Sequence, residues 1–393
     1  MTDKIPSGPR RRVLIIGADL VMPKLFYFSQ ELAKLGFGYA IYTHDVTPDS
    51  RAVVARAGAE FIAGPPHRRS IGRMLKDVWT LTTQVRRRDY HHADLYCDYH
   101  ILAALAYLLI LWAKRIPVVL WCRGELYDWP VFSWWEKLFF RVAMRLSRLV
   151  ILKERYMIDT LKDAGIYAPE KSIELHNTVP IGDAAPAPCF TKPQLRLLFL
   201  NSFKPWRNVG FCAQVAAALR AAGVPFRMTI VGDKNASQFL TDEAAGLHRD
   251  IEQLKLGDLV TMEGFSGDPM AFYREHDLFL LPADLIYCNF ALLEAMREGL
   301  VPIVSTKDED YRLVVEDGVS GYGLPMDADA WASQIARLAA DRDGARAVSA
   351  AAAERIRSHF SVERMFSRYA QHAGLVAVKE GQAMVPNAMD RAA

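Results

Sequence analysis

The sequence predicts an α/β protein with two domains, each built on a parallel β-sheet. Short apolar segments of strand length alternate with longer helical segments almost from end to end. Such alternation predicts parallel strands joined by crossover helices that cover both faces of a sheet. The chain has 393 residues, of which 51% are hydrophobic, so it is long enough to bury two cores.

The first half begins with the apolar segment 13–16, which ends at Gly17 as a buried strand ends at a turn. A helix is expected over residues 23–36. The strands expected in this half are residues 13–16, 39–42, 94–96, 117–121, 149–152 and 173–176. Helical segments separate most of them, so the half is expected to form one sheet with helices on both faces.

A proline-rich break at residues 180–193 suits an extended linker. Beyond it the alternation restarts, with strands expected at residues 197–200, 228–231, 259–262, 278–281 and 301–305, and with helices from 331 to about 375. We therefore place a first domain at residues 1–185 and a second at 194–360. A C-terminal helix with a disordered tail is expected at 361–393.

Charge is distributed unevenly along the chain. Residues 1–190 contain 26 Lys and Arg against 19 Asp and Glu, whereas the remainder contains 22 against 26. The basic half suits an anionic partner such as a membrane surface, and the alternative is a solvated surface with uneven charge. The net charge of the whole chain is +3. No nucleic-acid partner is expected.

The cysteines and the apolar segments predict a cytoplasmic protein. The five cysteines include no C-x-x-C pair, as in a reducing compartment. No signal peptide is recognised at the N-terminus. The longest apolar run, residues 101–113, is shorter than the ~20 residues of a membrane-spanning helix and is expected to be a core helix.

One polar loop follows the strand at 197–200. Lys204 and Arg207 lie where a strand-to-helix loop meets a ligand, and their charges suit a diphosphate. Asn208 is expected to cap the next helix, whose amide end would favour the same anion. The alternative is a pair of solvated loop cations.

A second loop follows the strand at 278–281 and leads into a short helix that ends at Gly299. Glu294 lies in the first turns of this helix, where its carboxylate can accept two hydrogen bonds from the hydroxyls of a ribose. The backbone N–H groups near Asn289 and Phe290 suit a phosphate. The alternative is that Glu294 is an ordinary carboxylate stabilised by the helix dipole.

A third loop, residues 315–325, contains three glycines in six residues, Gly318, Gly321 and Gly323. It does not lie between a first strand and a helix, as a phosphate-binding fingerprint does. We expect it to shape the edge of a cleft.

From about residue 195 to 360 the sequence resembles the C-terminal half of glycosyltransferase family 4, whose GT-B fold has two Rossmann-like domains facing a cleft. Five landmarks match the family's motifs in order. They are Thr-Ile-Val-Gly-Asp at 229–233, the strand at 259–264, Leu-Glu-Ala-Met at 293–296 with Gly-Leu-Val-Pro at 299–302, Asp-Gly-Val-Ser-Gly at 317–321 and Pro-Met-Asp at 325–327.

The resemblance implies a retaining hexosyltransferase. It would move a sugar from a nucleotide sugar to a glycan or lipid-linked acceptor, without a metal or cofactor, in polysaccharide or lipopolysaccharide assembly. It puts Arg207 at the lysine that binds the donor diphosphate and Glu294 at the glutamate that contacts the ribose. Phe265 would lie near the base, and the backbone amides of Asn289 and Phe290 near the donor.

The sequence departs from the family at three places. Ile286 stands where the first glutamate of the E-x7-E motif contacts the donor sugar. Ser202 replaces a diphosphate-binding arginine, a loss for which Lys204 is a candidate substitute. The usual His-Gly of the first domain is Arg123-Gly124. These departures leave open a catalytically weak or inactive partner subunit that binds a nucleotide sugar; an epimerase of related fold is disfavoured.

Arg123 and Glu125 follow the apolar strand that ends at residue 121. Arg123 is expected to stabilise charge on the leaving phosphate, and Glu125 to orient the acceptor hydroxyl. The alternative is a mutual surface ion pair. The segments 308–310 and 327–329 read Asp-x-Asp, but neither follows a buried strand with further ligands, so no metal site is expected.

Two helical segments are basic and amphipathic. In residues 134–149, Lys137, Arg141 and Arg145 recur at helical spacing opposite an apolar side that includes Leu138. Residues 71–88 are similar. This pattern favours peripheral contact with the inner face of an anionic membrane. The alternative is that both helices simply pack on the sheet.

Overall fold

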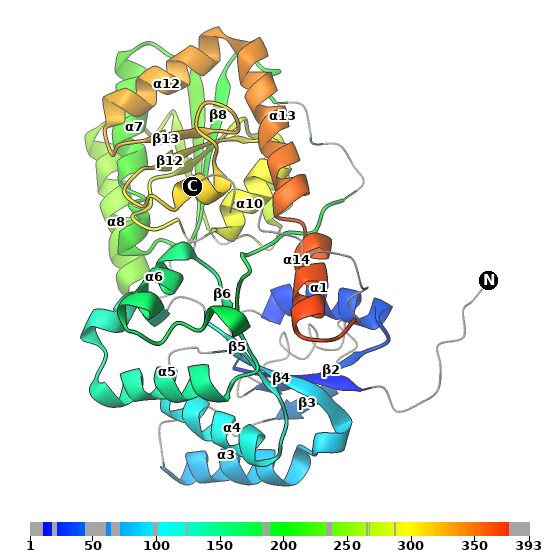
Figure 1. Cartoon of the computed structure of the whole chain (residues 1–393). Helices are drawn as coiled ribbons and strands as arrows, with labels where there is room; N and C mark the ends of the chain where they lie inside the picture. Colours follow the sequence, from blue (N-terminus) through cyan, green and yellow to red (C-terminus); the bar gives the residue numbers. More distant parts are fainter. Residues whose placement is uncertain are drawn as a thin grey trace, which may run out of the picture. The chain divides into compact units, whose positions relative to one another are not determined.

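The computed structural model describes residues 11–17, 22–43, 60–63, 71–96, 101–122, 125–182, 186, 189–232, 238–264, 266, 268–286 and 288–376. They form two compact units (Figure 1). Unit 1 comprises the chain up to His176 together with the segment that starts at Val362, and unit 2 comprises Asn177–Ser361. The sequence predicts instead a first domain that ends at residue 185 and a separate segment at 361–393.

Unit 1 contains a seven-stranded parallel sheet in the order β3-β2-β1-β4-β5-β6-β7. Its strands are β1 (Arg12–Ile16), β2 (Gly38–Thr43), β3 (Glu60–Ala63), β4 (Tyr90–Tyr96), β5 (Val118–Trp121), β6 (Leu149–Leu152) and β7 (Ser172–Glu174). Successive residues of a strand face opposite sides, so Leu14 packs into one core layer and Ile15 into the other.

Helices cover both faces of this sheet. On one face lie α3 (Ile71–Gln84), α4 (Ile101–Ala113), α5 (Trp134–Leu146) and α6 (Arg155–Asp163). On the other lie α1 (Met22–Lys34) and α14 (Val362–His372). Three short 3-10 helices in the described part of this unit are η2 (Arg87–Asp89), η3 (Glu125–Val131) and η4 (Pro169–Lys171).

Helix α14 belongs to unit 1 because its side chains complete that core. Phe366 packs against the sheet, and the Tyr369 hydroxyl donates to both carboxylate oxygens of Asp94 on β4 at 2.9 and 3.0 Å. His92 Nε2 lies 2.7 Å from the same hydroxyl. These groups are buried. A helix at the end of the chain therefore satisfies polar groups in the fourth strand.

Unit 2 contains a six-stranded parallel sheet in the order β10-β9-β8-β11-β12-β13. Its strands are β8 (Leu195–Leu200), β9 (Phe226–Val231), β10 (Val260–Glu263), β11 (Leu278–Leu281), β12 (Val301–Ser305) and β13 (Tyr322–Leu324). Its helices are η5 (Pro205–Arg207), α7 (Phe211–Ala221), α8 (Gln238–Gln253), α9 (Pro269–Glu275), α10 (Phe290–Arg297), α11 (Tyr311–Val314), α12 (Ala328–Ala340) and α13 (Arg342–His359).

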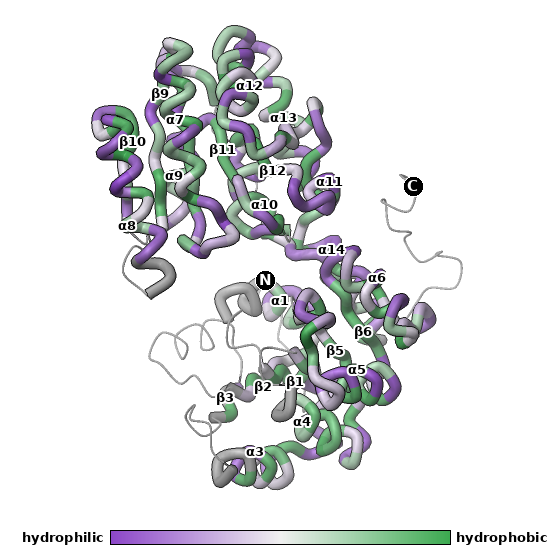
Figure 2. Tube along the Cα trace, turned by 90° about the vertical axis from the view of Figure 1, so that its left-hand side faces the viewer, coloured by the Kyte–Doolittle hydropathy of each residue, from purple (hydrophilic) through white to green (hydrophobic). Residues whose placement is uncertain are grey.

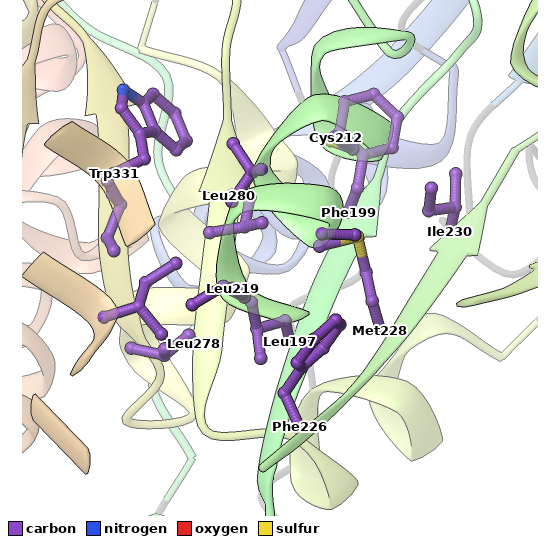
Figure 3. Close-up of a cluster of buried hydrophobic side chains, with 14 of the residues drawn as sticks. Leu197, Phe199, Cys212, Leu219, Phe226, Met228, Ile230, Leu278, Leu280 and Trp331 are labelled. Atoms are coloured by element: carbon purple, nitrogen blue, oxygen red, sulfur yellow. The ribbon is translucent and has the colours of Figure 1, made fainter. Parts of the chain in front are cut away.

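The core of unit 2 also has two layers. Leu197, Met228 and Leu280 face α7, α8 and α12, where Trp331 is fully buried (Figure 3). The neighbouring residue Leu198 faces α9, α10 and α13 instead. The predicted parallel α/β architecture is therefore confirmed in each unit. Among the described residues, no helix has both the length and the apolar character needed to span a bilayer.

Asp277 holds the amino-terminal ends of β8 and β11 together. Its carboxylate accepts from the Phe190 N–H at 2.7 Å and from three donors of Arg196, the backbone N–H at 2.9 Å, Nε at 3.1 Å and Nη2 at 2.7 Å. Asp277 is fully buried. Its carboxylate therefore joins the segment that enters unit 2 to the centre of the sheet.

We predict that Asp277→Ala lowers the free energy of unfolding by about 3–5 kcal/mol, because it leaves the Arg196 charge and a buried N–H without their acceptor. Urea unfolding followed by circular dichroism would measure the loss. Asp343→Ala, which removes a well-exposed carboxylate paired with Arg346, serves as the control and should unfold like the wild type. Equal stability of the two variants would contradict the assigned role of Asp277.

Candidate functional site

The sheet of unit 2 has a topological switch point between β8 and β11. From β8 the chain continues to β9 on one side, and it later returns to place β11 on the other side. The loops at the carboxyl ends of these two strands therefore diverge and leave a crevice, which is where open α/β sheets bind ligands. The two chemistry-bearing loops of the sequence analysis are these two loops.

The loop after β8 is fastened to the loop after β11. Arg207 Nη1 donates to the Leu285 carbonyl at 2.9 Å. Asn208 Nδ2 donates to the Pro282 carbonyl at 2.9 Å and to Asp284 Oδ1 at 2.6 Å. The guanidinium of Arg207 is thus held against the segment that leads into α10.

Asn208 does not cap the following helix, as the sequence analysis expected. That helix, α7, begins at Phe211, and Asn208 instead adopts a left-handed conformation with φ 50° that ends η5. Asparagine tolerates this conformation better than most residues. Its side-chain amide is then directed at the β11 loop.

The loop after β11 is fastened in turn to the loop after β12. Lys307 Nζ lies 2.8 Å from Asp284 Oδ1, and the Ile286 N–H donates to Asp308 Oδ2 at 2.8 Å. The Ile286 side chain is fully buried in the unit 2 core. At this position the chain therefore offers a core side chain and no carboxylate.

Glu294 lies half-buried in the middle of α10. The Tyr273 hydroxyl, from α9, donates to Glu294 Oε2 at 3.2 Å. Burial, together with the neighbouring Glu294 carboxylate, raises the pKa of Tyr273 well above its ordinary value. The phenol therefore stays protonated and acts as a donor that orients the carboxylate.

Asn289 and Phe290 form the start of α10. Asn289 is the N-cap residue, and its Oδ1 accepts from the Leu292 N–H at 3.2 Å. Asn177 Nδ2 donates to the carbonyl of the preceding residue, Cys288, at 3.0 Å. The start of the helix is thus fixed by the side chain of its own N-cap residue, Asn289, and by the side chain of Asn177, which lies outside the helix.

Ser202 and Lys204 share the loop after β8. Ser202 is half-buried, and its N–H donates to the side chain of Asn201 at 3.0 Å. Lys204 is exposed, with its ammonium 5.1 Å from the centroid of the Trp206 ring. Lys204 therefore extends the cationic character of Arg207 towards solvent.

Three glycines, one in the 229–233 motif and two in the loop 315–325, have a packing role. A Cβ on Gly232 would lie 2.4 Å from the Phe203 ring, and one on Gly323 would lie 2.3 Å from the Tyr311 ring. A Cβ on Gly321 would meet Pro302 at 2.4 Å. At these positions glycine lets neighbouring segments approach closely.

Two predicted site residues, Arg123 and Phe265, lie outside the described residues. Glu125 begins η3, and only its backbone is described. The remaining predicted residues fall into two sets. Ser202, Lys204 and Arg207 occupy the loop after β8; Asn289, Phe290 and Glu294 occupy the start and middle of α10. The bond from Arg207 to Leu285 joins the two loops.

The two Asp-x-Asp segments have structural partners. Asp327 is the N-cap residue of α12 and accepts from the N–H groups of Asp329 and Ala330 at 2.9 and 3.2 Å. Asp308 accepts from Ile286 as described above and from the Asp310 N–H at 3.0 Å. Within the described ranges, no three His, Cys, Asp or Glu side chains gather as a metal ion would require.

The sequence analysis missed two residues of this site. Asp284 comes three residues after the strand β11. A carboxylate in the loop at the end of a strand is a feature that the sequence alone could have indicated. Tyr273 could not have been found, because it contacts Glu294 from a helix 21 residues earlier. An arginine and a lysine in one loop, and a fixed carboxylate in the helix that follows the neighbouring loop, suit a ligand with a diphosphate at one end and hydroxyl groups at the other.

Family models match both units. A model described as Glycosyltransferase Family 4 matches residues 25–182, and one described as Glycosyl transferases group 1 matches residues 194–341. Together they match most of the chain. A comparison with curated proteins finds no match.

Solved structures share the fold at low identity. A glycosyltransferase from Rickettsia africae has a TM-score of 0.76 at 13% identity, over 93% of this chain and 98% of that one. HepE from Anabaena in complex with UDP has a TM-score of 0.75 at 16% identity, over 93% of this chain and 100% of HepE. The lipopolysaccharide outer core galactosyltransferase WaaB has a TM-score of 0.68 at 14% identity, over 92% of this chain and 98% of WaaB.

We predict that Asn208→Gly lowers the free energy of unfolding by about 1–3 kcal/mol, because Asp284 and Pro282 lose their donor. Glycine keeps the left-handed backbone, so the loss reports on the hydrogen bonds rather than on strain. The same variant should bind inorganic diphosphate more weakly, since the Arg207 loop is then held to the β11 loop by fewer hydrogen bonds. Urea unfolding measures the free energy of unfolding, and calorimetric titration measures the affinity for diphosphate. Wild-type values of both quantities would rule out this role for Asn208.

Proposed function

Because the chain belongs to the family 4 glycosyltransferases, we propose that it is a retaining enzyme that transfers a sugar from a nucleoside diphosphate sugar to a glycan or lipid-linked acceptor. The observation that carries this proposal is the fastening of the Arg207 loop to the loop that leads to Glu294, at the switch point of unit 2. The nucleotide would bind there.

Each end of the donor has a matching group in this site. Arg207, with Lys204 beside it, neutralises the diphosphate through charge-assisted hydrogen bonds. Glu294, oriented by Tyr273, accepts hydrogen bonds from the ribose hydroxyls. The start of α10, at Asn289 and Phe290, adds the positive end of a helix dipole. HepE, which shares the fold, binds UDP, so uracil is the base to test first.

The acceptor is assigned to unit 1. Arg123 and Glu125 follow β5 at a carboxyl end of that sheet, where Arg123 would stabilise the departing phosphate and Glu125 would orient the acceptor hydroxyl. WaaB, with the same fold, acts on the lipopolysaccharide outer core. We infer an acceptor of this kind, a growing polysaccharide or a lipid-linked glycan, met on the cytoplasmic side of the plasma membrane by a protein that binds the membrane peripherally.

A second candidate function is a partner subunit that binds a nucleotide sugar without turning it over. The fully buried Ile286 side chain favours it, because no carboxylate contacts the donor sugar from that position. The two functions differ in one assay. A transferase releases UDP from at least one sugar nucleotide of a panel, whereas a partner subunit binds UDP and releases none from any.

We predict that Arg207→Ala lowers kcat/KM for donor turnover about 100-fold or more, since it removes a group that stabilises developing charge. Glu294→Ala should weaken UDP binding by about 10- to 100-fold through the lost charged hydrogen bonds. UDP release and calorimetric titration measure the two effects.

Arg274→Ala is the matched control, because Arg274 lies in the same unit and its side chain is well exposed. It should keep wild-type turnover and wild-type UDP affinity. If Arg207→Ala behaves like this control, the diphosphate binds elsewhere. If Glu294→Ala does so, Glu294 has no contact with the ribose.

We also predict that turnover continues in the presence of EDTA, because arginine, lysine and a helix end neutralise the diphosphate in place of a divalent cation. Initial rates with EDTA and with added Mg²⁺ or Mn²⁺ should agree within about twofold. Loss of activity with EDTA and its recovery with one of these ions would show that the diphosphate is held through a metal.

A further inference from the structure

Helices α3, α4 and α5 expose an apolar surface on the side that faces away from the sheet. Among the described residues, six of the eleven exposed large apolar side chains lie on these three helices. The helices pack side by side on one side of the sheet (Figures 1 and 2). We call the six residues the outer surface: Leu75, Trp79, Leu109, Trp112, Trp134 and Leu138.

Helix α4 is apolar all round. Its 13 residues contain no charged side chain. The inner side buries Leu108 and Leu111, yet on the outer side Trp112 is 58% exposed. A helix that is apolar on every side is normally buried in a core, as the sequence analysis expected here. The structure therefore corrects that expectation for the outer half of α4.

Helix α5 combines apolar and basic residues on one exposed stripe. Trp134, Leu138, Arg141 and Arg145 follow one another at intervals of four, three and four residues, and all four are exposed. The sequence predicts Leu138 on the apolar side of this helix, opposite the basic residues. The structure gives that side to Phe139 and Phe140, so the exposed stripe carries tryptophan and leucine beside arginine.

Helix α3 repeats this arrangement. Leu75 and Trp79, one turn apart, are 61% and 68% exposed, and the exposed Lys76 lies beside them. The inner side of the helix is instead partly polar, because Asp77 is buried there and accepts a hydrogen bond from Tyr107 of α4 at 3.3 Å. Leu75 and Trp79 thus point outward, whereas Leu81 of the same helix is buried in the core.

The exposed charges around the outer surface are mainly positive. Lys76, Arg86, Arg115, Arg141 and Arg145 are exposed, whereas Asp128 is the exposed carboxylate among the described residues from 75 to 146. Tryptophan and long basic side chains are enriched where a protein meets lipid headgroups, since each has an apolar body and a polar end. The composition of the outer surface therefore matches an anionic bilayer.

We propose that the outer surface docks on an anionic lipid bilayer, with Trp79, Trp112 and Trp134 at headgroup depth and Arg141 and Arg145 against lipid phosphates. The inference deepens the proposed function, on which it rests for the reason a membrane is needed: it brings the enzyme to a lipid-linked acceptor. A second copy of this chain fits less well, because a symmetric contact would bring the arginines of both copies together.

Vesicle co-sedimentation tests the proposal. The wild-type protein should bind phosphatidylcholine vesicles that contain one third phosphatidylglycerol, and bind pure phosphatidylcholine weakly. Replacing Trp79, Trp112 and Trp134 together by Ser should lower partitioning about tenfold or more. Arg141→Gln with Arg145→Gln should lower binding to the anionic vesicles about fivefold per residue. Leu35→Ser, which changes an exposed leucine just after α1, is the control and should bind vesicles like the wild type.

UDP binding, followed as a thermal shift on the same preparations, separates this proposal from the proposed function. The triple tryptophan variant should keep the wild-type UDP shift, which also shows that it is folded. The docking proposal is overturned if the wild type binds UDP but no anionic vesicle, or if the triple variant still partitions like the wild type. It is also overturned if the wild type is a dimer in solution that the triple variant abolishes. A protein that binds vesicles but no UDP would contradict the proposed function alone.

Discussion

The pairing of β8 with β11 is the constraint on which the candidate site depends. These strands share only two register pairs, Leu278 with Leu197 and Phe279 with Leu198. Side chains hold both ends of this short pairing. Asp277 joins the strands at their amino ends through Arg196, and Arg207 and Asn208 join the following loops at the carboxyl ends. The site is therefore rigid where the chain diverges, which favours a ligand bound without large rearrangement.

The same bonds account for how the charged groups are positioned. A guanidinium has several N–H donors in a planar fork, so the bond to the Leu285 carbonyl fixes the direction of the others. The hydroxyl of Tyr273 similarly fixes the Glu294 carboxylate. Position 286 differs, because its isoleucine side chain is buried in the core and offers no charged group to a ligand. The nucleotide end of the site is thus more completely built than the sugar end.

Short apolar runs in the sequence predicted most strands of both sheets, because the strands of a parallel sheet are buried on both faces. The strands at 149–152, 278–281 and 301–305 were located to the residue. The strands β3 and β13 were missed, since neither is such a run. The return of α14 to unit 1 rests on a bond between Tyr369 and Asp94, 275 residues apart, which no local pattern records. The prediction was also wrong at Leu138: residues three and seven positions apart lie on one side of a helix, so the spacing itself puts Leu138 beside Arg141 and Arg145.

Arg207 in the loop after β8 and Glu294 in α10 could be proposed from their motifs, but their hydrogen-bond partners, the Leu285 carbonyl and Tyr273, needed the fold. Hydrogen–deuterium exchange with and without UDP tests most directly whether these loops form the nucleotide site. Peptides covering 201–208 and 284–293 should exchange more slowly when UDP is present, with little change elsewhere in unit 2. Unchanged exchange in both segments under saturating UDP, or protection confined to unit 1, would contradict the account.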